Sequence, residues 1–286
     1  MGLGNKNGKV MQRLAKIPGY ALLTIWTVFT VMLIGWVVFA SLSTSSEIFS
    51  DHMFAFKTGF HFENYVKAWK TQKVSVFFMN SLMYTIVSCT LIVVIAAPAA
   101  YVLSRFRFKG NMLLQNMFAS ALGIPVIMII MPLFGFASSL RLTNSRTVII
   151  FLYTAINVPF AVFYLLAFFK NLSFTYEEAA AIDGCSPMRT FWTIMFPLAQ
   201  PGIITVSIFN FITVWNEYFM SLIFANKTAV RPVAVGLYNM ISAMRYTGDW
   251  GGMFASVVIV FLPTFILYLF LSEKIIRGVT GGAIKG

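Results

Sequence analysis

Six long apolar runs dominate the sequence and limit the class of protein to which it can belong. They cover residues 20–42, 77–103, 112–139, 147–169, 198–224 and 252–271. Each run is long enough to cross the hydrocarbon core of a bilayer, which takes about 20 mostly apolar residues in a helix. We therefore predict an all-α, polytopic membrane protein with six transmembrane helices.

The composition agrees with a chain whose natural solvent is lipid. Hydrophobic residues make up 59% of the chain and charged residues only 10%, whereas soluble domains carry about 25% charged residues. Several runs contain proline, which membrane helices tolerate because neighbouring groups satisfy the freed carbonyls. No repeat or low-complexity linker divides the chain, so we predict a single transmembrane domain over residues 1–286.

The net charge of +12 indicates membrane anchoring rather than nucleic-acid binding. Basic residues lie between the runs and at their ends, where they set the topology and contact anionic lipid. With the N-terminus inside, the inner segments hold twelve of the 21 Lys and Arg residues. The first run is too long for the core of a signal peptide, so we expect it to be retained as a span. Six spans then place both termini in the cytoplasm.

The segment of about 170–197, between the fourth and fifth runs, carries the most local information. Thr175 followed by Glu178 is a capping-box pattern for the start of a helix, and Gly184 suits the left-handed residue that ends one. Ser186-Pro187 is typical of the N-cap and first residue of a second helix. We predict a short helix, a sharp turn and a second helix leading into the fifth span. This pattern fits a capped surface helix as well as a docking element for another protein.

Residues in this segment resemble the EAA loop of binding-protein-dependent ABC permeases. The matching positions are Glu178-Ala179-Ala180, Gly184, Ile194 and Pro197, with Phe196 where the family usually has Leu. In that family the loop helix docks into a groove on the ATPase and carries its motion into the membrane. The resemblance implies an ATPase-coupling surface that includes Glu178, Ala179, Ala180, Asp183 and Gly184.

Matches elsewhere in the chain resemble the carbohydrate-importing, maltose-permease-like branch of the same family. They lie at residues 60–65, 80–81, 99–110, 215–218, 232–236 and 278–286. The resemblance implies a type I ABC importer permease fold, as one permease domain in a bacterial inner membrane. It also implies the partners: a second permease subunit, two ATPase subunits, an extracytoplasmic solute-binding protein, and a sugar, oligosaccharide or related polyol as cargo.

Polar residues on the fifth run are the candidate substrate path. Ser207, Asn210, Thr213, Glu217 and Ser221 recur at steps of three and four residues, so on one continuous helix they fall within an arc of about 120°. Asn216, from the family-like segment 215–218, joins Asn210, Thr213, Glu217 and Ser221 as a path candidate. Such a face lines either a helix contact or a water-filled path. Glu217 is the one carboxylate inside a run, roughly 10 Å from its outer end, and suits either an outer gate or a structural hydrogen-bond hub.

The sequence lacks the motifs of an ATPase or of a membrane enzyme. It has no G-x-x-x-x-G-K-[ST] phosphate loop, so we expect no cofactor on this chain and assign ATP and Mg to the partner ATPase. Cys89 and Cys185 form no metal or disulfide pattern, and His52 and His61 do not form H-E-x-x-H. We predict a transporter subunit rather than an enzyme. The alternative is a stand-alone secondary transporter or channel, which would have to use Glu217 as its coupling charge. Such proteins often show two related halves, which we do not find.

Overall fold

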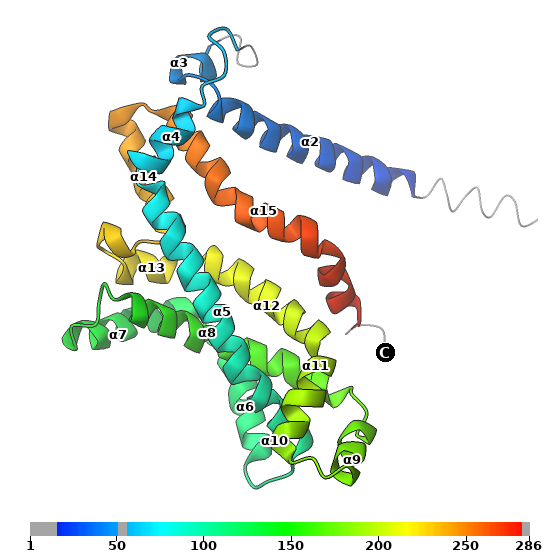
Figure 1. The fold of residues 1–286 in the computed structure, drawn as a ribbon. Coiled ribbons are helices and arrows are strands. Elements are labelled where there is room, and N and C mark those ends of the chain that lie inside the picture. The colour runs from blue at the N-terminus through cyan, green and yellow to red at the C-terminus, as the bar shows by residue number, and fades with distance from the viewer. Residues whose placement is uncertain (1–15, 51–55, 282–286) are drawn as a thin grey trace, which may run out of the picture. The chain divides into compact units, whose positions relative to one another are not determined.

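A computed structural model describes residues 16–50 and 56–281 of the chain. Every regular element in this described part is helical (Figure 1). The helices form two compact units. Unit 1 consists of the chain up to Gln72 together with Ile241–Ile259, and unit 2 consists of Lys73–Met240 together with the chain from Val260 onward. The assignment of residues 1–286 to one domain stays a prediction.

Unit 1 begins with the first predicted span. Its elements are α2 (Ile17–Ser41), α3 (Ser45–Ile48), α4 (Glu63–Lys70) and the adjoining parts of α14 (Val233–Thr247) and α15 (Trp250–Gly281). α2 is a long, straight helix (Figure 1). Its apolar side chains are exposed along most of its length. Exposed apolar surface of this extent is suited to contact with lipid tails or with another membrane subunit.

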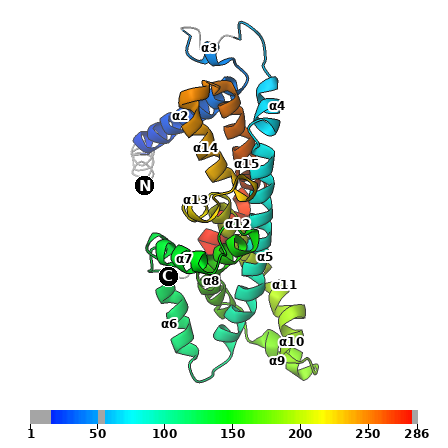
Figure 2. The same ribbon diagram turned by 90° about the vertical axis from the view of Figure 1, so that its left-hand side faces the viewer.

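Unit 2 contains the remaining helices (Figure 2). In chain order they are α5 (Val74–Arg105), α6 (Asn111–Ala121), α7 (Val126–Ser139), α8 (Arg146–Lys170), α9 (Thr175–Ile182), α10 (Pro187–Thr190), a π-helical turn (Phe191–Met195), α11 (Phe196–Leu198), α12 (Gln200–Trp215), α13 (Phe219–Phe224), a 3-10 turn (Thr228–Val230) and the other parts of α14 and α15. α5 packs most extensively against α8. Ala96, Ala97 and Ala100 of α5 are fully buried in one cluster with Leu165 and Phe169 of α8. Small residues let two membrane helices approach closely and so gain packing energy.

Four of the predicted spans are single long helices. They are α2, α5, α8 and the Trp250–Ser272 part of α15, and two bent helix pairs raise the number of spans to six if each pair crosses the membrane once. The prediction of an all-α, polytopic membrane fold is therefore confirmed.

The third predicted span, 112–139, is not one helix. It divides into α6 and α7, which meet at an angle of 97°. Gly123 lies in the break, and Pro125 is the N-cap of α7 with an extended backbone. Proline has no N–H to continue the hydrogen-bond ladder and disfavours a helical conformation in the residue before it. The expectation of a continuous helix is wrong. The residues at the break are uncharged and mostly apolar, like those of the helices on either side, so the hydropathy of the run does not reveal it.

The fifth predicted span, 198–224, is also interrupted. Pro187–Leu198 precedes α12 at an angle of 72°, and Pro197 lies in the last turn before this bend. α12 then ends at Trp215, before the separate short helix α13 begins. The expectation of one helix through this run is wrong. Pro197 bends the chain at the start of this run. Near the end of the run, after Trp215, hydrogen bonds from side chains replace the backbone hydrogen bonds of a continuous helix.

Side chains of α5 hold the loop that leads into α14. The Asn80 amide donates to the carbonyls of Ala229 and Arg231 at 2.9 and 3.0 Å. The hydroxyls of Ser81 and Tyr84 also bond to the backbone of this loop, at 2.9 and 2.8 Å. Irregular backbone among apolar helices needs such partners, because unsatisfied polar groups are costly there. Two of the family-like segments therefore lie against each other.

Candidate functional site

The predicted coupling loop contains the helix α9, but its start differs from the prediction. Phe174 is the N-cap and makes no side-chain cap bond, whereas Thr175 is already helical. The hydroxyl of Ser173 accepts a hydrogen bond from the Thr175 N–H at 3.2 Å. The predicted capping box between Thr175 and Glu178 is wrong, because the helix begins one residue earlier than that motif requires.

The end of α9 agrees with the prediction. Gly184 has a φ of 75°, in the left-handed region that glycine adopts without a steric cost. The Gly184 N–H donates to the Ala181 carbonyl at 3.1 Å, and the Cys185 N–H donates to the Ala180 carbonyl at 2.9 Å. This pair of bonds is the Schellman motif. Ser186 then caps α10 with its side chain, as predicted, so the turn between the two helices satisfies its own backbone.

The predicted coupling residues divide between two faces of α9. Ala180 is only 2% exposed, so it packs against its own chain and is not accessible to a partner. Glu178, Ala179 and Asp183 are exposed. Large apolar side chains extend the exposed face: Phe174, Tyr176, Ile182 and Met188. Exposed apolar side chains rimmed by polar ones are typical of a protein contact surface.

The buried face of α9 is held by an ion pair with the end of α5. Arg105 Nε lies 2.9 Å from Glu177 Oε1, and Arg105 Nη2 donates to the Leu172 carbonyl at 2.8 Å. The Arg105 Cζ atom also lies 4.2 Å from the centre of the Phe174 ring, within the range of a cation–π contact. The Arg105 side chain is only 3% exposed. The last turn of α5 is thereby attached to three points of the coupling loop.

A pocket of about 220 Å³ lies beside this ion pair, with Tyr101, Thr190 and Cys185 in its lining. Within the described residues, Arg105 Nε and Nη1 and both carboxylate oxygens of Glu177 make no hydrogen bond, so the contact between the two side chains is an ion pair without hydrogen-bond geometry. Burial raises the pKa of Glu177, and the neighbouring Arg105 guanidinium opposes that rise. The pocket is large enough to hold water molecules.

The predicted substrate-path residues do not share one helical face. Because α12 ends at Trp215, Glu217 and Ser221 lie beyond the helix that carries Asn210 and Thr213. The expectation of a continuous stripe is wrong for this reason. Whether these residues line a path for cargo stays a prediction.

The side chains on and just after α12 differ in what they contact. Thr213 and Asn216 are exposed and bond back to carbonyls of their own helix at 2.9 and 2.8 Å. Asn210 is 1% exposed, and in the part of the chain that the structure describes neither atom of its amide has a hydrogen-bond partner. Among the five predicted path residues, Thr213 and Asn216 are therefore the two with exposed polar side chains.

Glu217 joins the break after α12 to α8 and α13. Its Oε1 atom accepts a hydrogen bond from the Met220 N–H at 2.7 Å, and its Oε2 atom accepts one from the Ser221 N–H at 3.1 Å. Oε2 also accepts a bond from the Tyr153 hydroxyl at 3.0 Å, and that hydroxyl bonds to the Ser221 hydroxyl. A carboxylate is favourable at a helix N-terminus, where backbone N–H groups are free. This geometry is that of the hydrogen-bond hub considered for Glu217.

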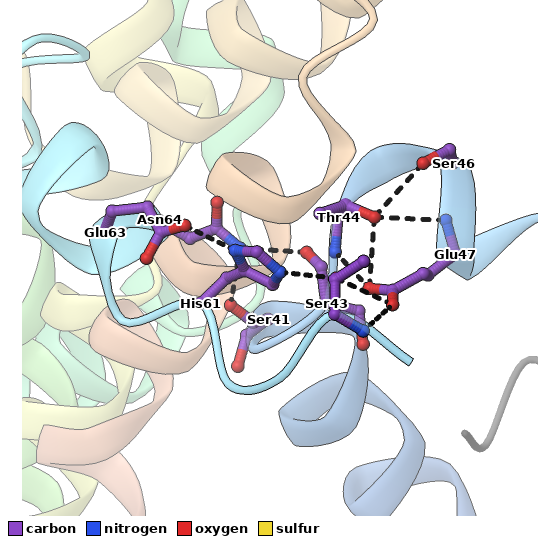
Figure 3. Close-up of polar contacts among 9 residues, drawn as sticks. Ser41, Ser43, Thr44, Ser46, Glu47, His61, Glu63 and Asn64 are labelled. Atoms are coloured by element: carbon purple, nitrogen blue, oxygen red, sulfur yellow. Dashed lines mark hydrogen bonds and ion pairs between the residues drawn. The ribbon is translucent and has the colours of Figure 1, made fainter. Parts of the chain in front are cut away.

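A separate polar cluster in unit 1 surrounds Glu47 (Figure 3). Thr44 and Glu47 form a capping box at α3, and Thr58 donates to Glu47 Oε1 through its N–H at 2.9 Å and its hydroxyl at 2.8 Å. The bond from the Thr44 N–H, aided by those from Thr58 and opposed by burial, lowers the pKa of Glu47 to about 2. His61 extends the cluster by bonding to the Thr58 hydroxyl at 2.7 Å and to Glu63. These bonds fold the segment after α2 onto itself.

The family-like segment 60–65 is tied to this cluster through Asn64. Its amide donates to the carbonyls of Ser41 and Ser43 at 3.1 and 2.9 Å (Figure 3). A Cβ atom on Gly251 would lie 2.6 Å from the Asn64 Nδ2 atom. The end of α2, the start of α4 and the start of α15 therefore fit together only with glycine at position 251.

The sequence pattern does not reveal the residues that attach α9 to its own chain. In the sequence, Glu177 is one of several good helix formers in its segment, and Arg105 is one of the basic residues found between the apolar runs. One signal is present, because adjacent helical residues point about 100° apart. Glu177 and Glu178 therefore cannot both face the same surface.

Comparison with known proteins assigns the chain to a family. Residues 75–280 match the model of the family "Binding-protein-dependent transport system inner membrane component". The chain is 32% identical to the diacetylchitobiose uptake system permease protein NgcG of Streptomyces coelicolor, over 93% of this chain and 88% of that protein. It is 30% identical to the sulfoquinovosyl glycerol transport system permease protein SmoH of Agrobacterium fabrum, over 88% and 87%. It is 29% identical to the trehalose/maltose transport system permease protein MalG of Thermococcus litoralis, over 97% and 99%.

The fold also resembles a solved structure. A chain in the crystal structure of a bacterial ABC transporter involved in the import of the acidic polysaccharide alginate matches with a TM-score of 0.78. The match covers 92% of this chain and 97% of that chain at 22% identity, and it supports the fold alone. The apolar spans and the family match agree on a multi-pass transport protein that is not itself an enzyme. The chain belongs to the family of inner membrane components of binding-protein-dependent transport systems, as a permease subunit.

Proposed function

We propose that this permease subunit serves an ATP-driven importer whose cargo is a sugar, an oligosaccharide or a related polyol. The support comes from the relatives, whose names refer to diacetylchitobiose, sulfoquinovosyl glycerol and trehalose or maltose. The alternative, a stand-alone secondary transporter or channel, needs a free coupling charge. Both oxygens of Glu217 already accept backbone N–H bonds, which speaks against that role.

The exposed face of α9 is the contact for an ATPase subunit in this proposal. The main support is the exposure of Ile182. Its side chain is 87% exposed at the end of α9, where backbone hydrogen bonds of the following turn hold the helix end in place. A large apolar side chain gains free energy when another molecule covers it. Glu178 and Asp183, exposed beside it, offer carboxylates to basic groups of the partner. ATP and Mg then belong to the ATPase.

The remaining partners follow from the same proposal. Two ATPase subunits and a second permease subunit complete the membrane complex, and an extracytoplasmic solute-binding protein delivers the cargo. Thr213 and Asn216, the exposed members of the path set, face the second permease subunit. In this proposal, Asn210, Glu217 and Ser221 stabilise the packing of the helices that form that path.

The orientation places α9 and both termini in the cytoplasm. It is tested by labelling single cysteines in intact cells, after Cys89 and Cys185 are replaced by serine. Arg189→Cys should resist a membrane-impermeant reagent, and Asn226→Cys should react with it. Both positions are exposed in the structure. Labelling at position 189 from outside would reverse the orientation.

The ATPase contact is tested by co-purification and by uptake in reconstituted vesicles. Ile182→Asp places a charge where an apolar contact is proposed, so it should reduce the amount of ATPase that co-purifies with the permease and reduce uptake in parallel. Leu142→Asp is the matched control, because Leu142 is also exposed but lies in the loop after α7. Equal ATPase retention in wild type and Ile182→Asp would contradict the proposed contact.

A further inference from the structure

The last turn of α5 is a junction between several helices of unit 2. The Leu103 carbonyl accepts hydrogen bonds from the side-chain amides of Asn111 and Gln115 in α6, both at 3.1 Å. Gln115 also accepts a bond from Lys170 Nζ, at the end of α8, at 3.0 Å. Arg105, in the same turn as Leu103, makes the contacts to the coupling loop. Movement of this one turn therefore reaches α6, α8 and α9.

The connection from this turn to α9 differs from the others because it is a buried ion pair. The Arg105 side chain is 3% exposed and that of Glu177 is 18% exposed. Separating such a pair leaves a buried charge without a partner, which costs far more than breaking a neutral bond at the surface. The contacts to Leu172 and Phe174 fix the direction of the guanidinium at the same time. α9 is thus held in one position against the end of α5.

The two neighbouring carboxylates of α9 have different surroundings. Glu177 faces α5 and is paired, while Glu178 is exposed. The helix is therefore attached to its own chain through one acid and presents the other to solvent. An element that passes force between two proteins needs a firm attachment on each side.

We propose that the Arg105–Glu177 ion pair is the positioning element that transmits movement of α9 to α5 during transport. The inference rests on the proposed role of α9 as the ATPase contact. Neither residue touches cargo or nucleotide, so both act by position. With the pair intact, α9 and the end of α5 move as one piece. With the pair broken, α9 follows the ATPase while α5 stays behind, and ATP is hydrolysed without moving cargo.

The test uses the full transporter complex in vesicles and measures cargo transported per ATP hydrolysed. Glu177→Gln keeps the size of the side chain, and Arg105→Met keeps the chain length but removes the charge. Both variants should still co-purify with the ATPase. Their ratio of cargo transported to ATP hydrolysed should fall about fivefold or more, which is the fold-change that a typical coupling free energy produces. The double variant Arg105→Glu with Glu177→Arg should regain most of the ratio. Arg107→Met is the matched control, because Arg107 is exposed two residues along the chain.

Three outcomes would count against the proposed role of the Arg105–Glu177 ion pair. A wild-type ratio in both single variants overturns the proposal, and so does a double variant that is no better than the single ones. Loss of ATPase retention in Glu177→Gln also counts against it, since the proposal confines the defect to transmission. If the proposed ATPase contact itself is wrong, the result is different. Ile182→Asp would then still co-purify with the ATPase, whatever transport-to-hydrolysis ratio the Arg105 and Glu177 variants show.

Discussion

Gly236 lies so close to Phe77 that a Cβ atom on Gly236 would be 2.2 Å from the Phe77 Cδ2 atom. The Phe77 ring is buried in a cluster with Trp215 and Val233, so it has little room to move. α14 can therefore pack against α5 in this way only with glycine at position 236. This relationship gives a physical reason for glycine in the family-like segment 232–236.

We predict that Gly236→Ala destabilises the protein by about 1–3 kcal/mol through overpacking. Thermal unfolding of the detergent-solubilised protein should report a lower midpoint. Adding Phe77→Leu should restore part of the loss by making space. Gly135→Ala is the control, because nothing lies within 4 Å of a Cβ there. A Gly236→Ala variant as stable as wild type would show that the two helices separate freely.

We predict that Glu217→Ala lowers stability because it leaves the N–H groups of Met220 and Ser221 and the Tyr153 hydroxyl without their acceptor. At about 0.5–1.5 kcal/mol for each of the three bonds, the loss amounts to about 1.5–4.5 kcal/mol. Glu217→Gln should be milder, since its amide oxygen still accepts. Thermal unfolding measures both variants.

The control for the Glu217 series is Asn226→Ala, which removes an exposed side chain that bonds to the nearby Ile223 carbonyl. It should leave the unfolding midpoint almost unchanged. If Glu217→Ala keeps wild-type stability and loses uptake, the carboxylate acts on the cargo path rather than as a structural hub.

The Glu47 cluster predicts a specific dependence of stability on pH. The folded-state pKa of about 2 lies below the ordinary value of 4.5, so the ionised carboxylate adds stability above about pH 4.5, and this is lost as the pH falls through the folded value. Thr58→Val removes a hydroxyl donor and should raise the pKa of Glu47. The variant should be less stable at neutral pH and lose less on acidification.

Unfolding midpoints measured at about pH 7 and about pH 3 test this prediction. Thr71→Val is the control, because Thr71 is exposed after α4 and lies outside the Glu47 cluster. The prediction fails if Thr58→Val and wild type lose the same stability between the two pH values.

The two faces of α9 predict opposite defects for neighbouring alanines. Ala180 is buried, so Ala180→Trp should destabilise the permease itself by disrupting its packing. Ala179 is exposed, so Ala179→Trp should leave folding intact and reduce ATPase co-purification. Unfolding midpoints and co-purification, measured on both variants, separate the effects. A reversed pattern would mean that α9 is rotated relative to the structure.

Local chemistry made much of the fold predictable. The apolar runs locate the spans because lipid demands a minimum helix length. Gly184 ends α9 as predicted, since only a residue tolerant of positive φ fits that turn. Predictions based on continuous hydropathy failed at Pro125 and at Glu217. Proline and side-chain hydrogen bonds interrupt a helix without changing its average polarity.

By itself, the sequence determined the class of protein, the approximate spans, the turn after α9 and the family. These follow from composition, spacing and local backbone preference, which act between residues close in the chain. Only the tertiary structure decided that Glu177 faces Arg105 while Glu178 is exposed, and that Ala180 is buried. It also decided that Asn80 supports the loop before α14. Such choices depend on contacts between distant segments, whose free energy no local pattern contains.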